Sequence, residues 1–415
     1  MIIAGGALLA VRLGMRRPSL PNAPVLRSVV GVSAGWIGLS MIGDGVPALL
    51  LPHRLLQDGP PDATALGITT LVGIALAAVA QPVAGRWSDA VGRFPVIATG
   101  SAVAAIGLWL LGWTPAAAPG AVVALVGASI AQAGYQPLMP DRLPHSWRGR
   151  GGGLKSAFDV GGAMVGFVLL GAMIGAGRPD LAAMTLTVAL IAGFVASRVL
   201  LGTGRQISAR PTESRPSIRS AFVRVIAARF LFLLGIYVIG RFLLLFVSER
   251  FGYSPDDAAA EAGMVLAVLA LFTVLASIPA GWLTDRLGRR ALMVGGGLVG
   301  GAGIALVSVA GSTTALVAAG SLMAVGSAAF GSASWALLAD VSPSPRAGGL
   351  LGVANLGTAG AAAAAGAFGA LIDRVGFGPA FGLAAVCSVA GAIVAMTLAE
   401  TTTSRMRTAP AEGAT

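Results

Sequence analysis

The feature that most constrains this chain is a series of long apolar segments that recur from one end to the other. A helix that crosses a bilayer needs about 20 mostly apolar residues. Only 11% of the residues are charged and the mean hydropathy is +0.84, whereas ordinary soluble domains carry about 25% charged residues. The sequence therefore predicts an all-α membrane protein with twelve transmembrane helices, at residues 28–51, 64–84, 94–113, 119–139, 153–175, 181–202, 227–248, 260–280, 291–310, 314–338, 348–372 and 378–399.

The basic residues predict the orientation of these helices. Lysine and arginine collect in every second connection, in the middle loop and in both tails, and the opposite side keeps only Arg54, Arg178, Arg250 and Arg374. Because basic loops stay in the cytoplasm, we expect both termini there, in the plasma membrane, such as the inner membrane of a bacterium. Topology then explains the net charge of +11, and we expect no nucleic-acid partner.

A polar, basic and proline-containing segment, "GTGRQISARPTESRPSIRS" (202–220), lies between the sixth and seventh apolar runs and is typical of a linker. The opening "MIIAGGALLA" has no basic region before it, so we do not expect a signal peptide. We predict a cytoplasmic tail at 1–25, an N-terminal six-helix bundle at 26–202, a cytoplasmic linker at 203–225, a C-terminal six-helix bundle at 226–400 and a second tail at 401–415.

Two motifs occur once in each half of the chain. "AGRWSDAVGR" (84–93) and "AGWLTDRLGR" (280–289) follow the second and eighth runs, and Asp89 and Asp285 are 196 residues apart. "PDRLPHSWRGR" (140–150) and "ADVSPSPRAGG" (339–349) follow the fourth and tenth runs, and Asp141 and Asp340 are 199 residues apart. The two motifs therefore repeat with nearly the same spacing, which indicates that a six-helix unit has been duplicated in parallel orientation. In transporters of this arrangement the two halves rock about a central solute site.

The paired G-x-x-x-D-x-x-G-R loops, the two six-helix halves and the basic linker resemble the major facilitator superfamily over nearly the whole chain. The resemblance implies a secondary active transporter that works by alternating access. In that family the loop residues bridge neighbouring helix ends and hold the cytoplasmic side shut. Carried over by position, the first such latch comprises Gly85, Asp89, Gly92 and Arg93, and the second comprises Gly281, Asp285, Arg286, Gly288, Arg289 and Arg290.

The resemblance also suggests a second cytoplasmic network, in which Asp141 acts with Arg148 and Asp340 acts with Arg346. The alternative is that these side chains simply reach for water at helix ends. Ala90 stands where a basic residue is common in the family, so we expect the first latch to be the weaker of the two.

Short stretches, "AQPVAGRWSD", "AGYQPLMPD" and "WALLAD", resemble the sucrose and glycoside proton symporters of the superfamily. They favour proton-coupled uptake of a small polar solute such as a sugar. The alternatives are proton-driven efflux of a drug-like or lipid-like compound, and a membrane receptor that does not transport. We expect a monomer in the lipid bilayer. We also expect that it is not an enzyme and has no cofactor or metal, since the two histidines, His53 and His145, lie outside the predicted spans.

In the superfamily the first, fourth, seventh and tenth helices line the solute path. Amides and hydroxyls there can bond to sugar hydroxyls, and an indole can stack on the apolar face of a sugar ring. The alternative for each side chain is a packing contact between helices. The candidates are Trp36, Ser40, Gln132, Tyr135, Gln136, Tyr237 and Trp335, with Asn355 from the eleventh helix.

Asp44 lies within an apolar run, where an ionised carboxylate costs about 2.5 to 3.5 kcal/mol or more. The repeat places "IGR" (239–241) over "IGD" (42–44), so we predict that Arg241 is its counter-charge across a cavity. Protonation of Asp44 would release the pair during transport, unless the pair is permanently ionised and structural. The stretch "GDGVP" (43–47) also favours a break in the first helix.

Asp159 is a further candidate for a proton site. It lies four residues after Lys155 on the same helix face, so the alternative is a local i,i+4 ion pair.

The two latches generate a test. If Asp285 helps to close the cytoplasmic side, Asp285→Asn shifts the protein toward the inward-open state and slows transport more than Asp89→Asn does. The measurement is the accessibility of engineered cysteines on the two faces. Equal and negligible changes in both variants would contradict the latch assignment.

Overall fold

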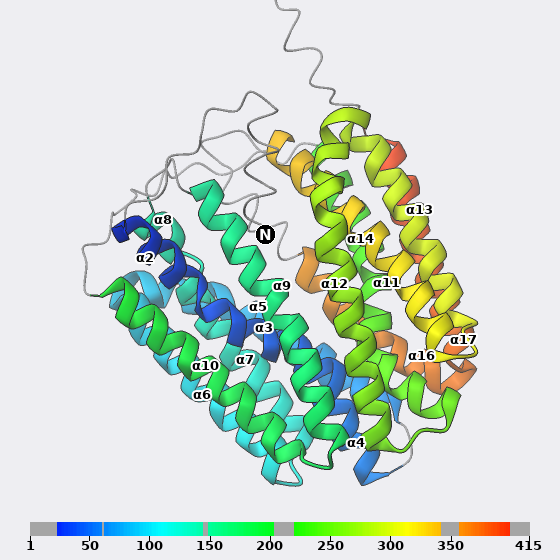
Figure 1. Ribbon diagram of the computed structural model, residues 1–415, viewed down its shortest axis with the longest axis horizontal. Helices are drawn as coiled ribbons and strands as arrows, with labels where there is room; N and C mark the ends of the chain where they lie inside the picture. The colour runs from blue at the N-terminus through cyan, green and yellow to red at the C-terminus, as the bar shows by residue number, and fades with distance from the viewer. Residues whose placement is uncertain (1–22, 60–61, 144–147, 203–219, 342–356, 399–415) are drawn as a thin grey trace, which may run out of the picture.

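The computed structural model describes the chain except for residues 1–22, 60–61, 144–147, 203–219, 342–356 and 399–415 (Figure 1). The described residues are helical almost throughout and include no strand. Eleven of the described helices are long and apolar enough to cross a membrane, which confirms the predicted all-α membrane fold. The predicted run at 348–372 lies partly outside the described residues. Its described part is helical at 357–364, in η4 (Ala365–Ala367) and in α16 (Phe368–Val375).

The first half of the chain contains six spans. The first span consists of α2 (Ala23–Ser33), α3 (Gly35–Gly45), η1 (Val46–Leu50) and α4 (Leu51–Asp58). It is followed by α5 (Ala63–Val91), α6 (Arg93–Trp113), α7 (Ala117–Tyr135), the short α8 (Leu138–Arg142), α9 (Arg148–Gly175) and α10 (Pro179–Leu201).

The second half continues with α11 (Ser220–Phe251), α12 (Pro255–Leu287), α13 (Arg289–Ser308) and α14 (Thr313–Val341), and ends with the span that contains α16 and with α17 (Phe377–Met396). The packing of the first half recurs in the second. Helix α6 packs on α7 as α13 packs on α14, α5 on α7 as α12 on α14, and α3 on α10 as α11 on α17. The two six-helix bundles are therefore pseudo-symmetric, as the sequence repeat predicts.

The repeated motif adopts the same backbone turn in both halves. Gly92 separates α5 from α6 with φ 98° and ψ 162°, and Gly288 separates α12 from α13 with φ 93° and ψ 151°. Residues with a Cβ rarely adopt a positive φ of this kind. The glycine before the motif arginine is therefore required by the turn between two helices.

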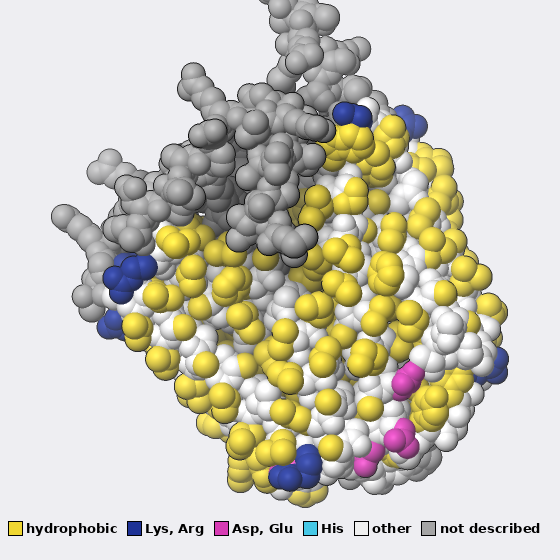
Figure 2. All heavy atoms as spheres, in the orientation of Figure 1, with side chains coloured by type: hydrophobic (Ala, Val, Ile, Leu, Met, Phe, Trp, Pro, Cys, Tyr) yellow, Lys and Arg dark blue, Asp and Glu magenta, His cyan; other side chains and the backbone are white. Residues whose placement is uncertain are grey.

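The outer surface matches the requirements of a bilayer. Figure 2 shows hydrophobic side chains across the middle of one face, with the visible charged side chains near its edges. Large apolar side chains are exposed along α5, α10 and α12, among them Val79, Val199 and Ile278. Such exposure suits lipid and would be unfavourable in water.

The first span contradicts the expected helix break at "GDGVP". Residues 46–50 form a π-helix, η1, which joins α3 to α4 without interrupting the span. Pro47 and Pro52 have no N–H to donate, and the Leu51 N–H bonds to the Val46 carbonyl five residues earlier. The wider turn therefore satisfies the backbone locally, and π-turns of this kind are frequent at functional sites.

The two halves are joined by polar contacts at one end of the bundle. We call this the far end, and we call the opposite end, where Leu201 and Ser220 flank the linker, the linker end (Figure 1). At the far end, His53 Nε2 of α4 lies 2.7 Å from Asp256 Oδ1 of α12. Asp373 of α16 accepts hydrogen bonds from the backbone N–H groups of Ala63 (3.2 Å) and Thr64 (2.7 Å) at the start of α5.

We call these contacts between the halves at the far end the seam. The backbones of α5 and of the segment before α16 also approach closely between the halves. A Cβ placed on Gly67 of α5 would lie 2.1 Å from the Gly366 carbonyl oxygen, so only glycine fits there. The hydrogen bonds and the ion pair that join one described residue of the first half to one of the second lie at the far end. The described residues therefore show the two halves fastened at the far end.

His53 corrects one expectation from the sequence. It lies inside the first span, Val25–Gln57, rather than outside it, and its side chain is fully buried. The prediction ended the first helix at residue 51, whereas the helix continues to Asp58. The apolar pattern ends earlier than the helix because the last turns of the helix carry polar side chains, of which His53 contacts the other half.

The far-end contact predicts a shift in conformation. Asp256→Asn removes the charge from the hydrogen bond between His53 and Asp256, whose carboxylate is partly exposed. We expect the free energy that favours the closed far end to fall by about 1 kcal/mol, which raises the open population about fivefold. The measurement is labelling of Ile74→Cys, a cavity position, by an impermeant thiol reagent added at the far end, in a Cys387→Ser background. The control is Asp257→Asn, which alters a contact within α12, with Ser254. Equal labelling in both variants would contradict the assignment.

Candidate functional site

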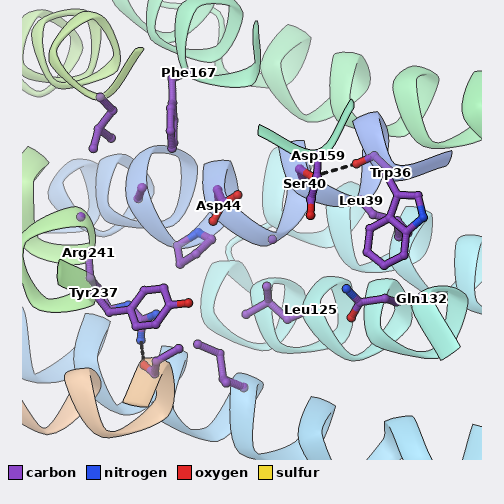
Figure 3. Close-up of a pocket in the computed structure, with 17 residues that line it drawn as sticks. Trp36, Leu39, Ser40, Asp44, Leu125, Gln132, Asp159, Phe167, Tyr237 and Arg241 are labelled. Carbon is purple, nitrogen blue, oxygen red and sulfur yellow. Dashed lines mark hydrogen bonds between the residues drawn. The ribbon is translucent and has the colours of Figure 1, made fainter. Parts of the chain in front are cut away.

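A cavity of about 320 Å³ lies between the two halves (Figure 3). Helices α3, α5, α7 and α9 and the π-helix η1 line it from the first half, and α11, α12 and Ala362 line it from the second. Its wall is mainly apolar and aromatic with a few polar and charged groups, which is the usual character of a small-molecule site. The lining residues are Trp36, Leu39, Ser40, Gly43, Asp44, Pro47, Ala48, Ile74, Leu125, Gln132, Asp159, Phe167, Tyr237, Gly240, Arg241, Leu266 and Ala362.

Asp44 presents a carboxylate to this cavity. It lies in the last turn of α3, directly before the π-helix, and its side chain is exposed to the cavity. It forms no hydrogen bond or ion pair with the described residues. Its charge is therefore available to a proton, to water or to a solute.

Arg241 faces the same cavity from the other half. Its side chain is 5% exposed, and Nη1 donates to the Ala362 carbonyl oxygen at 2.9 Å. Nε is buried without a hydrogen-bond partner. The guanidinium thus has donors left unused at a site of low polarity.

The predicted partnership of Asp44 and Arg241 is only partly realised. The two residues line one cavity from opposite halves, and their charges interact electrostatically. They do not form an ion pair within 4.0 Å in the described structure, and the role of Arg241 as the counter-charge of Asp44 across the cavity stays a prediction. The repeat pointed to two residues of one cavity, but the distance between them depends on how far apart the two halves lie.

Asp159 is held by fixed partners, in contrast to Asp44. Lys155 Nζ lies 2.7 Å from Asp159 Oδ2, so the i,i+4 pair is formed. The Ser40 hydroxyl of α3 donates to Asp159 Oδ1, which ties α9 to the first span. Lys155 also lies over the ring of Trp36, 3.7 Å from its centroid. Ser40 and Trp36 thereby connect the Lys155–Asp159 pair to the cavity wall.

The structure divides the other solute candidates. Trp36, Ser40, Gln132 and Tyr237 line the cavity. Tyr135 and Gln136 instead line a smaller neighbouring cavity of about 180 Å³ that shares Trp36.

Two candidates fall elsewhere. Trp335 does not line the cavity, because it lies toward the Val341 end of α14, where the Arg229 guanidinium stacks 4.4 Å from its ring centroid. Asn355 lies outside the described residues.

The first latch forms a network within the first half. Arg93 Nη1 donates to Asp89 and, at 2.8 Å, to the Ser88 hydroxyl, while Arg93 Nε donates to Asp141 Oδ2 at 2.9 Å. The arginine therefore bridges the end of α5, the start of α6 and α8. Asp141 has Arg93 as its partner, whereas the side chain of its predicted partner Arg148 lies outside the described residues. Gly85 lies in α5, where its carbonyl oxygen accepts a hydrogen bond from the Ser88 hydroxyl at 2.8 Å, and its role in the latch stays a prediction.

The second latch is described only in part. Arg289 Nη1 donates to the Ala336 carbonyl oxygen at 3.2 Å, and the Arg286 guanidinium lies 3.6 Å from the ring centroid of Trp282. Gly281 and Arg290 lie in α12 and α13, on either side of the turn at Gly288. The side chains of Asp285 and Asp340 and the whole of Arg346 lie outside the described part, so these predictions remain predictions.

Sequence reasoning missed several wall residues. Phe167 of α9, Leu266 of α12 and Ala362 line the cavity, although nothing distinguishes them from other apolar residues in their spans. Their position depends on which face of each helix turns inward. The sequence singled out charged, polar and aromatic side chains, and it offered no signal for the purely aliphatic part of the wall.

The comparison with family profiles identifies one family. The family profile described as "Major Facilitator Superfamily" matches residues 34–272 and 225–414. No curated protein sequence matches the chain.

Solved structures share the fold at low sequence identity. A POT family transporter in complex with a thioalcohol-conjugated peptide is 13% identical with a TM-score of 0.71, covering 89% of this chain and 95% of its own. A D-xylose–proton symporter is 16% identical with a TM-score of 0.68, covering 91% of this chain and 97% of its own.

The different surroundings of the two carboxylates predict different effects on stability. Asp159→Ala removes the contacts to Ser40 and Lys155 and leaves an unpaired lysine, so we expect a loss of about 1 to 2 kcal/mol. Asp44→Asn breaks no contact, and we expect a change within about 0.5 kcal/mol. The measurement is the thermal unfolding midpoint of each purified variant under identical conditions. A larger loss in Asp44→Asn than in Asp159→Ala would contradict the contacts described.

Proposed function

This chain belongs to the major facilitator superfamily and is a multi-pass membrane transporter, and we propose that it is a proton-coupled symporter for a small polar solute such as a sugar. The observation that carries the proposal is the cavity between the two halves, into which Asp44 projects an unpaired carboxylate. An ionisable side chain at such a depth is a functional candidate by default. The cavity is the solute site, and the halves rock about it by alternating access.

The orientation follows from the basic residues. The linker end carries most of the arginines and faces the cytoplasm. The far end then faces the exterior, and the seam formed by His53, Asp256 and Asp373 is an exterior gate that opens in the other half of the cycle. We further propose that the protein acts as a monomer in a bacterial inner membrane.

Asp44 is the proposed coupling site. When it is ionised, it shares the cavity with Arg241 at a distance and makes no bond that must break before it takes up a proton. Asp159 has its partners in place, and its charge is offset by Lys155. A proton therefore alters the net charge of the cavity most directly at Asp44. The proton bound there can cross the membrane in the same step as the solute.

The fold alone leaves the solute open. One similar structure is named as a D-xylose–proton symporter and another as a transporter with a bound peptide conjugate, so related architectures hold different solutes. The wall of this cavity combines Trp36 and Tyr237 with the amide of Gln132. This combination supports a solute with both a polar and an apolar face.

The coupling role predicts a separation of two activities. In proteoliposomes, Asp44→Asn loses accumulation driven by an inward proton gradient, by about tenfold or more, and keeps solute exchange at equal pH. The measurement is uptake of labelled pentoses, hexoses and hexuronates, with solute-induced proton flux followed in parallel by a dye trapped in the vesicles.

Asp159→Asn is the control, and it retains gradient-driven accumulation in proportion to the amount of folded protein. Uphill transport by Asp44→Asn at the wild-type level would eliminate the coupling role of Asp44. Proton movement in the direction opposite to the solute would favour the efflux alternative.

A further inference from the structure

The charges that face the cavity do not all cancel in local pairs. Asp159 is neutralised by Lys155 at 2.7 Å. Asp44 and Arg241 remain, one on each half, with opposite charges and no bond between them. The empty cavity is therefore neutral only when Asp44 is ionised. As soon as Asp44 takes a proton, the charge of Arg241 has no counter-charge in the wall.

No other described group can take over this role. Besides Asp44, the ionisable residues of the described cavity wall are Asp159 from α9, which is paired with Lys155, and Tyr237 and Arg241 from α11. The lining residues from α5, α7 and α12 are Ile74, Leu125, Gln132 and Leu266, and none of them is ionisable. An unpaired guanidinium in a site of low polarity is costly. The loaded carrier therefore needs a negative charge from the solute.

Arg241 is equipped to receive that charge. A guanidinium has five N–H donors in a planar fork that suits a carboxylate, and Arg241 uses Nη1 on the Ala362 carbonyl while Nε has no partner. Figure 3 shows Tyr237 beside Arg241, with Asp44 across the cavity. A solute that binds Arg241 would thus lie between an aromatic ring and the proposed proton site.

We propose that the transported solute is a small organic anion, whose carboxylate or similar group binds Arg241 while Asp44 carries the coupled proton. This inference rests on the proposed symport and specifies its solute class. The cavity is neutral in both states in which the carrier changes its opening from one side of the membrane to the other. In one state Asp44 is ionised and no solute is bound, and in the other Asp44 is protonated and one monoanion is bound. The volume of about 320 Å³ is at the lower limit for ligand sites, which suits a molecule of sugar-acid size.

Other solute charges fit this arrangement less well. A neutral sugar would leave Arg241 without a counter-charge in the protonated state. A cation would compete with the proton for Asp44, and competition at one site yields exchange in opposite directions instead of symport. Only an anion uses both the proton and the arginine in the same loaded state.

The test is binding to the purified full-length protein by calorimetry, with two matched triplets that differ in charge. The first triplet is glucuronate, glucose and glucosamine, and the second is benzoate, benzyl alcohol and benzylamine. At about pH 5.5 the acid of at least one triplet should bind tenfold or more tightly than its neutral and amine partners. In the wild type its affinity should rise as the pH is lowered, because protonation of Asp44 removes a negative charge that repels the anion.

Variants separate the two charges. Asp44→Asn mimics the protonated carboxyl, so the acid should bind tightly without this dependence on pH. Arg241→Gln should lose tenfold or more of this affinity, and Arg241→Lys, which keeps the charge, should retain part of it. Arg229→Gln is the matched control, since it removes a buried arginine of the same helix that does not line the cavity. Thermal unfolding of each variant identifies any loss that is due to misfolding.

Three results would overturn the inference: no binding by either acid, neutral or amine members that bind as tightly as the acids, or acid binding that is unchanged in a folded Arg241→Gln. Because binding is measured without a gradient, these results are independent of transport. Anion binding with the expected variant pattern, but without proton-driven accumulation in vesicles, would instead contradict the proposed symport.

Discussion

Inside a bilayer every backbone polar group has to find its partner within the protein, and every charge has to be offset or to face water. The first span illustrates how strictly this holds, because two prolines lead to a π-helical turn and not to a break. The same constraint keeps charged side chains few and near the ends of the helices. Those that lie deeper, such as Asp44 and Arg241, face the cavity between the halves.

The two ends of the bundle differ in how the halves are held. At the far end an imidazole contacts a carboxylate, and Asp373 caps the first turn of α5, where the helix dipole favours a negative charge. These contacts are directional, few and partly exposed, so each is weak enough to break in every cycle. Around the cavity the described residues of the two halves face each other without a direct ion pair. A carrier that alternates between two openings needs contacts at the far end that hold the halves together but can break. It also needs a cavity whose two sides can move apart.

The contrast between the two carboxylates explains why one is proposed to couple and the other to stabilise. Asp159 joins Ser40 of α3 to Lys155 of α9, so its charge is part of the packing of the first half. Asp44 has no such partner, and a change in its charge breaks no contact. In the proposed symport, Arg241 supplies a fixed positive charge and Asp44 a negative charge that a proton can remove, which links protonation to the charge of the solute that can enter.

The sequence by itself determined the class of fold, the spans and the duplication, because the cost of exposing polar groups to lipid is expressed residue by residue in the apolar pattern. It also pointed to Asp44 and Arg241 as residues of one cavity, since a repeat preserves position along a helix. Only the tertiary structure decided that the two charges stand apart, that Trp335 stacks on Arg229 away from the cavity and that His53 meets Asp256 across the seam. Those facts depend on the rotation of each helix about its axis and on the separation of the two halves, and uniformly apolar helices carry little sequence signal for either.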